Sequence, residues 1–289
     1  MEYIPMRRAA ILTAATTTLA TVALAGQSYR TITEARTARA EDSLFVDVKF
    51  MAGTLQLAPG DGTSLYRATI NYNEGDFLAF TDYYPDKNRL EIGLRPKEDL
   101  VSRLGRIKTA QRLDLSVTPL VPLRLSLELG AAEAELELGG ISLVGADIVA
   151  GAATAHLSFG EPNRTTCNRL TLRAGAAEFR ADGLANARCQ HIVFAGGVGD
   201  VTLDFTSRWT GAMVHSAEIS LGLGQLTLRL PETLGVAIDV DRFLVSFDDV
   251  GFTKSGARYV SPGYRSATSK LDIKLKAVLG DIDIVWIEP

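Results

Sequence analysis

The chain has 289 residues, of which 46% are hydrophobic and 22% are charged. This length and composition suffice for one long hydrophobic core or two small ones. Thirty basic and 34 acidic residues give a net charge of −4, which excludes a strongly basic chain of the kind that binds nucleic acid. The composition does not choose between an enzyme, a scaffold and a binding protein.

Residues 1–25 have the pattern of an export signal. Arg7 and Arg8 form a positive start, an uncharged stretch of small and apolar residues follows, and Ala23-Leu24-Ala25 matches an A-x-A cleavage site. A membrane span needs about 20 predominantly apolar residues, whereas this stretch is short and holds five threonines. A retained anchor is the alternative. We expect cleavage before Gly26 and an exported, periplasmic or extracellular protein with no membrane span after cleavage.

The next segments differ in their patterns. Residues 26–43 are polar without periodicity, which predicts a mobile leader. Residues 44–96 predict a non-repeating N-terminal β region, and residues 97–111 are charged and predict a connector. Within the β region, strands are expected at residues 66–72, 78–80 and 89–94, with a turn at residues 82–88.

Residues 112–289 are organised by a repeat. One nine-residue phrase occurs five times, and its leading glycines are separated by 21, 24, 22 and 25 residues: Gly130, Gly151, Gly175, Gly197 and Gly222. Apolar and polar residues alternate on both sides of each glycine, which is typical of strands with one buried face. Each unit is therefore expected to contain a strand, a corner marked by glycine, and a second strand.

The residues at equivalent positions of the units indicate how the units stack. The third residue after each leading glycine is polar: Glu133, Thr154, Glu178, Asp200 and Gln225. The eighth residue before it is apolar from the second unit onward: Leu143, Cys167, Cys189 and Val214, after Pro122 in the first. Such columns favour in-register stacking. We predict an all-β fold, a parallel β-solenoid of about 21–25-residue coils; an antiparallel meander is the alternative.

Weaker copies of the phrase lie on either side of these five units. Ala52-Gly53-Thr54, followed by Leu55 and Leu57, is a candidate first coil. Strands are expected at residues 236–240 and 243–247, followed by a polar loop at residues 253–270. The stretch from Gly280 to Trp286 repeats the corner and strand, so we expect the array to end there, with Trp286 capping the last coil.

The Gly-Ala-Ala-Glu and Gly-x-Gly-Asp/Gln corners resemble those of the bacterial toast-rack family. Residues 44–96 resemble the domain that precedes its rack, and the family is similar in turn to adhesin-type domains and to the C-terminal domain of LiaF-type envelope stress proteins. The resemblance implies a β-solenoid at the cell envelope and supplies no catalytic residues. The chain has no transmembrane bundle in its sequence, unlike LiaF-type proteins, which weakens a direct signalling role.

The two cysteines occupy one register in adjacent units. Stacking would place the backbones of Cys167 and Cys189 about 4.8 Å apart, within reach of a disulfide in an oxidising compartment. Two small apolar side chains stacked in the core are the alternative. His156, His191 and His215 share no register, so we expect surface histidines and neither a metal site nor a cofactor.

The polar column allows one catalytic hypothesis. Glu178 and Asp200 are neighbours in it, and carboxylates on adjacent coils could bind Ca²⁺ or act as the acid/base pair of a polysaccharide-cleaving enzyme. Thr154 separates them from Glu133, and solvated corner residues are the other interpretation. We expect a non-enzymatic envelope protein that presents a scaffold or adhesin-like surface to an envelope polymer or protein. A carbohydrate-active enzyme and an envelope-stress sensor are the alternatives.

Overall fold

A computed structural model describes residues 28–97, 110–207, 209, 216–256 and 258–288. The predicted signal peptide (residues 1–25) lies outside these residues, as does the predicted connector (residues 97–111) apart from its ends. The described residues form seventeen strands and one short 3₁₀ turn, η1 (Pro85–Lys87), with no α-helix among them. The all-β class is therefore confirmed. No helix within the described ranges is long and apolar enough to cross a membrane.

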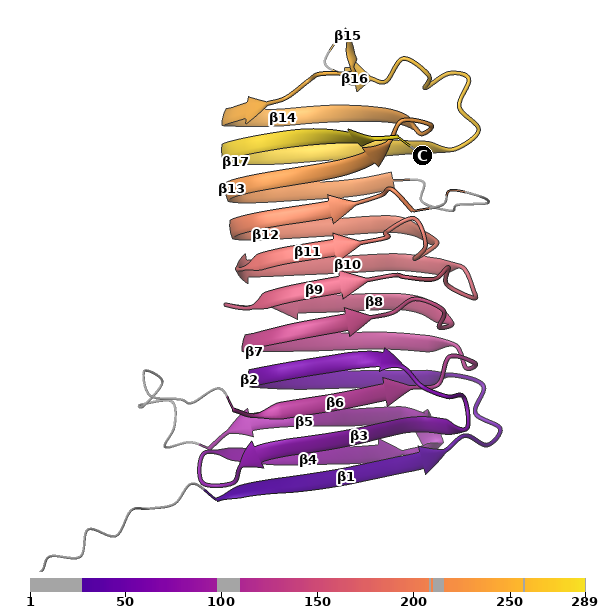
Figure 1. Ribbon diagram of the computed structural model, residues 1–289, viewed down its shortest axis with the longest axis vertical. Helices are drawn as coiled ribbons and strands as arrows, with labels where there is room; N and C mark the ends of the chain where they lie inside the picture. Colours follow the sequence, from indigo (N-terminus) through magenta and orange to yellow (C-terminus); the bar gives the residue numbers. More distant parts are fainter. Residues whose placement is uncertain (1–27, 98–109, 208, 210–215, 257, 289) are drawn as a thin grey trace, which may run out of the picture.

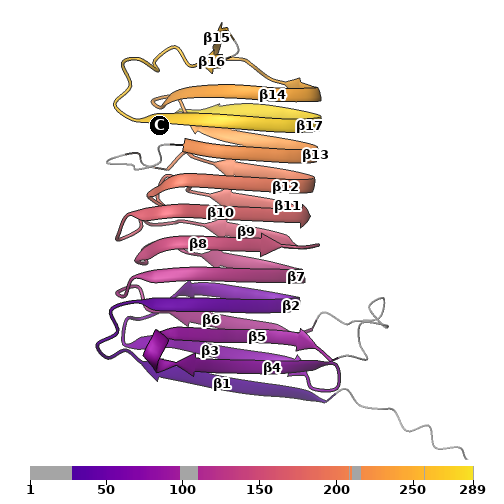
Figure 2. The same ribbon diagram turned by 180° about the vertical axis from the view of Figure 1, so that it is seen from behind.

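The strands form two stacks that face each other across an apolar core (Figure 1). Six long strands turn a corner and contribute to both stacks: β2 (Leu44–Pro59), β7 (Leu123–Glu137), β12 (Cys189–Asp204), β13 (Ser216–Pro231), β14 (Gly235–Phe247) and β17 (Lys270–Ile287). Two further units divide at the corner into separate strands: β8 (Leu143–Ala150) with β9 (Thr154–Ser158), and β10 (Cys167–Ala176) with β11 (Glu178–Asp182). We call the stack with β9 and β11 the front stack, and the stack with β8 and β10 the back stack (Figure 2).

The repeat units pair in parallel and in register. The first half of β7 pairs with β8 and the second half with β9, and β12 pairs along β13 from His191 to Asp204. The predicted parallel stacking is thus confirmed, and the antiparallel meander is wrong for the repeat. Period-two alternation in each strand sends every second side chain into the core. One such column of buried residues comprises Leu127, Ile148, Leu172, Phe194, Ile219 and Leu275.

The two stacks meet through these columns. Phe194 of the back stack contacts Phe179 of the front stack, with ring centroids 5.5 Å apart. Each fully buried side chain of this size contributes about 1.5–3 kcal/mol of burial free energy. The repeated apolar positions therefore hold every coil to its neighbours and to the opposite stack.

The N-terminal end adds five shorter strands outside β2: β1 (Tyr29–Thr37), β3 (Ser64–Asn73), β4 (Phe77–Tyr84), β5 (Arg89–Pro96) and β6 (Arg112–Val117). Strands β5 and β6 run parallel to β2, whereas β1, β3 and β4 pair antiparallel. The candidate first coil is confirmed, because Ala52-Gly53-Thr54 pairs with the corner of β7 that starts at Ala131.

The predicted mobile leader at residues 26–43 is wrong for β1. This strand pairs with β3 along its whole length, and Ile32 packs against the core. The Tyr66 hydroxyl donates a hydrogen bond to Glu34 at 2.7 Å, and the Arg36 guanidinium lies 4.1 Å from the centroid of the Tyr83 ring. An edge strand buries only part of one face, so its sequence can remain polar and still form a strand.

The C-terminal end departs from chain order. Strand β17 inserts between β13 and β14 and runs parallel to both, while β15 (Thr253–Ser255) and β16 (Arg258–Val260) cover part of β14. The prediction that the array ends at Trp286 is therefore wrong. A Cβ at Gly280 would lie 1.8 Å from the carbonyl oxygen of Gly224, so only a glycine fits above β13. Strand β17 has that glycine, whereas β14 has Val245 at the equivalent position.

Candidate functional site

The glycine corners bring successive coils unusually close together. A Cβ at Gly175 would lie 2.8 Å from the carbonyl oxygen of Gly151, and one at Gly197 would lie 2.6 Å from that of Gly175. Contacts this short exclude any side chain unless the backbone shifts. Close approach thus explains four of the five leading glycines, Gly130, Gly175, Gly197 and Gly222, whereas the nearest atom at Gly151 is 3.2 Å away.

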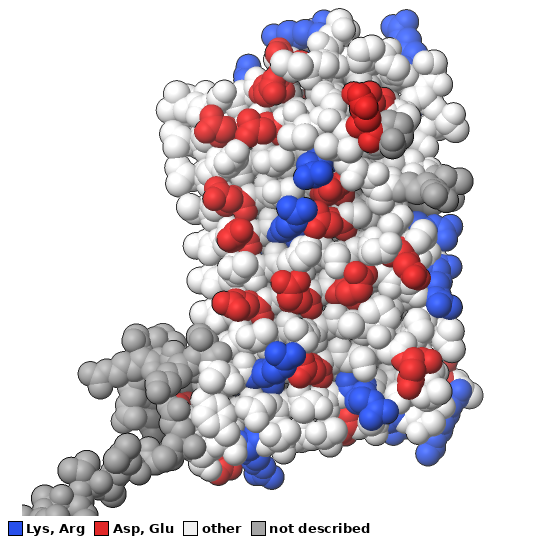
Figure 3. Space-filling view, in the orientation of Figure 1, with Lys and Arg blue, Asp and Glu red and all other residues white. Residues whose placement is uncertain are grey.

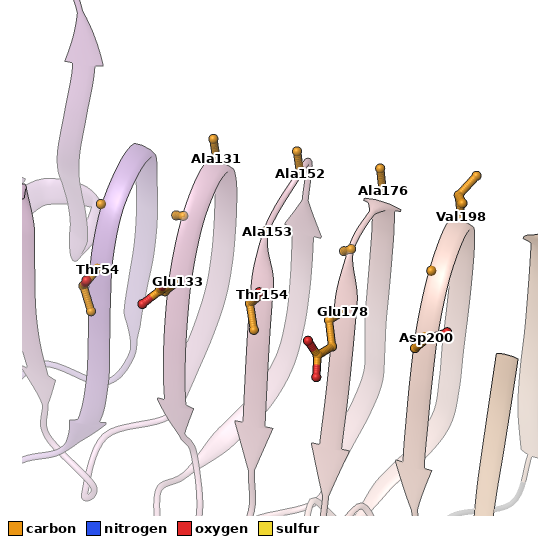
Figure 4. Close-up of a pocket in the computed structure, with 14 residues that line it drawn as sticks. Thr54, Ala131, Glu133, Ala152, Ala153, Thr154, Ala176, Glu178, Val198 and Asp200 are labelled. Carbon is orange, nitrogen blue, oxygen red and sulfur yellow. The ribbon is translucent and has the colours of Figure 1, made fainter. Parts of the chain in front are cut away.

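An open groove of about 610 Å³ runs along this edge of the rack, over the corners of five coils. Ala131, Ala152, Ala176 and Val198 project outward along it, and the polar residues lie to one side (Figure 4). We call it the corner groove, and its lining consists of Gly53, Thr54, Ala131, Ala132, Glu133, Ala152, Ala153, Thr154, Ala176, Ala177, Glu178, Val198, Gly199 and Asp200. Its floor is made of small side chains, so a bound chain could approach the backbone closely.

The predicted polar column borders this groove. Thr154 pairs with Glu133 on one side and with Glu178 on the other, and the pairing of β11 with β12 sets Glu178 beside Asp200. The column also contains Thr54 and Asp281, which the sequence pattern of the five units did not include. Both follow a corner glycine directly, and that signal could have identified them.

The carboxylates of the column are exposed to solvent. Neighbouring coils are about 4.8 Å apart, so Glu178 and Asp200 lie one step apart, and Glu133 and Glu178 lie two steps apart. Repulsion between exposed charges at such distances is about 1 kcal/mol in water. Repulsion among the carboxylates of the column therefore costs little stability. The column presents a negative electrostatic potential that falls off over about 8 Å at physiological salt.

A second charged cluster lies beside the column on the front stack. His156 contacts the carboxylates of two flanking coils, with Nδ1 2.9 Å from Glu135 and Nε2 2.8 Å from Asp182. Arg180 donates a hydrogen bond to Asp182 at 2.6 Å. Burial raises the pKa of Asp182, but the hydrogen bonds from Arg180 and His156 outweigh it and leave the pKa below its ordinary value.

The other histidines are separate from this cluster. His191 lies exposed on the back stack, with Nδ1 2.9 Å from the Ser216 hydroxyl, and His215 lies outside the described residues. In the ranges that the structure covers, no group of three histidine, cysteine or carboxylate side chains could hold a metal ion.

Acidic side chains outnumber basic ones over the middle coils of the front face (Figure 3). From the corner onward, β7, β9, β11, β12, β13 and β17 carry nine acidic residues and two arginines, Arg180 and Arg229. Both arginines pair with carboxylates, Asp182 and Asp204, on or beside their own coil. The excess of negative charge therefore faces the solvent beside the corner groove.

The cysteines are joined in a disulfide that links the units of β10 and β12. Cys167 pairs with Cys189 in the β ladder, their Cα atoms are 4.1 Å apart and both residues are fully buried. The bond closes a loop with a sequence separation of 22, for which the chain-entropy model gives about 3 kcal/mol of stabilisation. It fastens two of the coils whose corners line the groove.

The family profile described as "N-terminal domain of toast_rack, DUF2154" matches residues 25–178. This match covers more than half of the chain. The chain belongs to the toast_rack family. The match extends past the N-terminal β region at residues 44–96 and includes the corners of β7 and β9, with Glu133 and Thr154. No curated protein matches the sequence.

Several solved structures are similar to this toast_rack chain. A "putative cell adhesion protein" from Clostridium sporogenes is 15% identical, with a TM-score of 0.46 over 90% of this chain and 100% of that one. A "putative adhesin" from Bacteroides fragilis is 10% identical, with a TM-score of 0.43 over 90% and 99%. A "putative lipid binding protein" from Parabacteroides distasonis is 11% identical, with a TM-score of 0.31 over 88% and 96%. Similarity at this level does not indicate a shared ligand or activity.

Proposed function

We propose that this toast_rack protein is a non-enzymatic, exported envelope protein whose repeat forms a β-solenoid and whose corner groove binds a basic partner. The partner is a cationic segment of an envelope protein or polymer. The observation that carries the proposal is the continuous groove over five coils, bordered by Glu133, Glu178 and Asp200. The role is that of an adhesin-like surface or scaffold at the cell envelope.

The geometry of the groove favours an extended partner. Its floor of glycine, alanine and one valine leaves room for a main chain to lie against the rack, and its carboxylates recur at multiples of about 4.8 Å. In-register pairing and the buried disulfide between Cys167 and Cys189 hold these spacings before a partner arrives. A preformed surface loses little conformational entropy on binding, which favours affinity.

A carbohydrate-active enzyme is the second candidate, because Glu178 and Asp200 are neighbours in one column. A general acid at neutral pH needs a carboxyl group kept protonated by burial or by a close negative partner. Both residues are exposed at an open corner, and the groove floor beside them is too shallow to remove them from water. A role as an envelope-stress sensor rests on the family resemblance alone.

The test is a pull-down of residues 26–289 on isolated envelope fractions, with released sugars assayed in the same tube. A triple variant, Glu133→Gln with Glu178→Gln and Asp200→Asn, removes the charge of the groove. A matched control removes three carboxylates from the back stack: Glu128→Gln, Glu218→Gln and Asp241→Asn. We expect retention without sugar release, at least a tenfold loss of retention in the groove variant, and a change below twofold in the control.

Two outcomes would reject the proposal. Sugar release that disappears in Glu178→Gln would establish the enzyme instead. Equal retention of the wild type and the groove variant would show that the corner carboxylates do not contact a partner. Raising the salt concentration should weaken the retention of the wild type, because exposed charges are screened.

A further inference from the structure

The back stack contains a β-bulge where β7 pairs with β8. Leu123 pairs with Leu143, but the next residue, Arg124, pairs with Gly145, so Val144 has no partner in β7. In the sequence pattern, Pro122 stood in one column with Leu143 and Cys167. The structure places Leu123 in that column instead. Bulges interrupt a ladder and redirect the side chains beside them.

A notch of about 300 Å³ lies at this bulge, between β7, β8 and β10 on the side shown in Figure 2. Arg124, Gly145 and Arg169 follow one another in register across the three strands. The two arginines are thus two coil steps, about 9.6 Å, apart, with no side chain between them. The complete lining consists of Arg124, Leu125, Val144, Gly145, Ala146, Asp147, Asn168, Arg169 and Thr171.

Gly145 leaves this notch open without being required by the backbone. A Cβ at this position would meet its nearest atom, the carbonyl oxygen of Arg169, at 3.4 Å, which is an ordinary contact. The corner glycines differ, since a Cβ at Gly197 would come within 2.6 Å of a backbone oxygen. The backbone at Gly145 is also outside the left-handed region. A Cβ therefore fits there, and the side chain of a larger residue would extend into the notch.

The notch is positively charged on a chain of net negative charge. Among the described residues, neither Arg124 nor Arg169 forms an ion pair, whereas the one carboxylate of the lining, on Asp147, pairs with Arg173 at 3.0 Å. The Arg124 guanidinium lies 6.0 Å from the centroid of the Phe45 ring. Arg169 is followed in register by His191, so the adjacent coil adds no negative charge.

We propose that this notch binds an oxyanion: a phosphate, sulfate or carboxylate group held between the guanidinium groups of Arg124 and Arg169. Guanidinium forks bind such groups through paired, charge-assisted hydrogen bonds, and Asn168 and Thr171 add neutral donors. The volume is about ten times the share of one water molecule in the liquid. An oxyanion therefore fits together with part of the molecule that carries it. The notch lies on the face opposite the acidic front stack, and this inference does not depend on the corner groove.

The experiment measures binding to residues 26–289 by titration calorimetry with three probes: inorganic phosphate, linear polyphosphate and polygalacturonate. Inorganic phosphate represents a small free anion, and the polymers represent phosphate and carboxylate groups borne by an envelope polymer. We expect saturable binding of at least one probe. In Arg124→Gln with Arg169→Gln, that binding weakens at least tenfold.

A variant that fills the notch tests the contribution of its shape to binding separately from that of its charge. Gly145→Val keeps both arginines and places a β-branched residue in a strand, where such residues are well accommodated. We expect a loss of at least tenfold in affinity. Asp147→Asn removes the only carboxylate and should strengthen binding. Arg124→Lys with Arg169→Lys keeps the charge but loses the forks, and should give an intermediate affinity.

The control is Arg180→Gln on the front stack, which is expected to change the affinity less than twofold. Circular dichroism and the melting temperature establish that each variant folds; if the double Gln variant does not fold, Gly145→Val and Asp147→Asn carry the test. Binding of phosphate alone assigns a free anion, and binding of a polymer alone assigns a polymer-borne group. Absence of binding to all probes, equal binding by Gly145→Val, or equal losses in Arg180→Gln would overturn the proposal.

Discussion

The interior of the rack and its two ends are built by different rules. In the interior, coils stack in parallel with glycine at the corners, and one disulfide joins neighbouring units. At the ends, antiparallel strands and aromatic contacts replace this repeat, as in the pairing of β1 with β3 and the packing of Phe247 on Tyr259. Interior positions are therefore restricted by the coils on both sides, whereas end positions are restricted on one side.

The largest expected difference concerns glycines with positive φ. Gly224 has a φ of +134°, and a Cβ there would lie 1.9 Å from the carbonyl oxygen of Gly199. Overpacking and backbone strain together make Gly224→Ala cost about 3–5 kcal/mol of unfolding free energy. Gly256, at the C-terminal end, has a φ of +66°, and no atom of the described residues lies within 4 Å of an added Cβ, so Gly256→Ala should cost about 1 kcal/mol. Urea unfolding measures the loss of unfolding free energy in both variants. Equal losses would contradict the expectation that interior positions are more restricted than end positions.

The disulfide gives the next largest effect. Replacing both cysteines, Cys167→Ala with Cys189→Ala, should lower the unfolding free energy by about 3 kcal/mol, because the unfolded chain regains the freedom that the closed loop removed. The measurement is urea unfolding of the wild type and the double variant, each with and without a reducing agent. A reductant that destabilises the double variant as much as the wild type would refute the assignment of this effect to the bond.

At the N-terminal end, the expected effect is smaller and local. Tyr66→Phe removes the hydrogen bond to Glu34 and should cost about 1.5 kcal/mol, since hydrogen bonds to charged groups contribute about 1.5–3 kcal/mol. Burial, together with the Glu34 contact, raises the pKa of the Tyr66 hydroxyl well above its ordinary value, so the donor stays protonated at neutral pH. Hydrogen exchange should accelerate in β1 and stay unchanged in β12. Faster exchange in both strands would contradict the expectation that the N-terminal end opens without the interior coils.

The smallest effect is a dependence on pH at the front stack. Asp182 has a folded-state pKa below its ordinary value of 3.8, so its ion pairs stabilise the fold fully above the unfolded-state pKa. That contribution is lost as the pH falls through the folded-state pKa. Asp182→Asn should cost about 1 kcal/mol at neutral pH. Urea unfolding over a range of acidic pH should show this difference shrinking; a constant difference would exclude the carboxylate as its source.

The interior was predictable from sequence because its constraints are local and repeated. Period-two alternation located the strands, and the glycine spacing alone placed Cys167 beside Cys189 and Glu178 beside Asp200. Each of these relations follows from in-register stacking. The first coil at Gly53 could be identified for the same reason, since its corner phrase copies those of the later units.

The ends and the notch could not be predicted in the same way. Strand β1 buries few residues, so its polar sequence resembles a leader. The position of β17 depends on the close approach of Gly280 to Gly224. These two glycines are 56 residues apart in the sequence and meet only because their strands stack. The bulge beside Arg124 changes the register by one residue, and its one sign in the sequence is Pro122, which interrupts the apolar column. These features depend on contacts between units, which a pattern within one unit does not contain.

The insertion of β17 has a consequence for the order in which the rack is completed. During synthesis, β14 leaves the ribosome before β17 does, yet its place in both stacks is beyond β17. The outer edge of β13 therefore stays unpaired until the last strand is available, and the C-terminal end closes only after translation has passed Lys270. Chains truncated before that residue would expose two open strand edges and become prone to aggregation. Strand β17 thus covers one edge of each of its two neighbours.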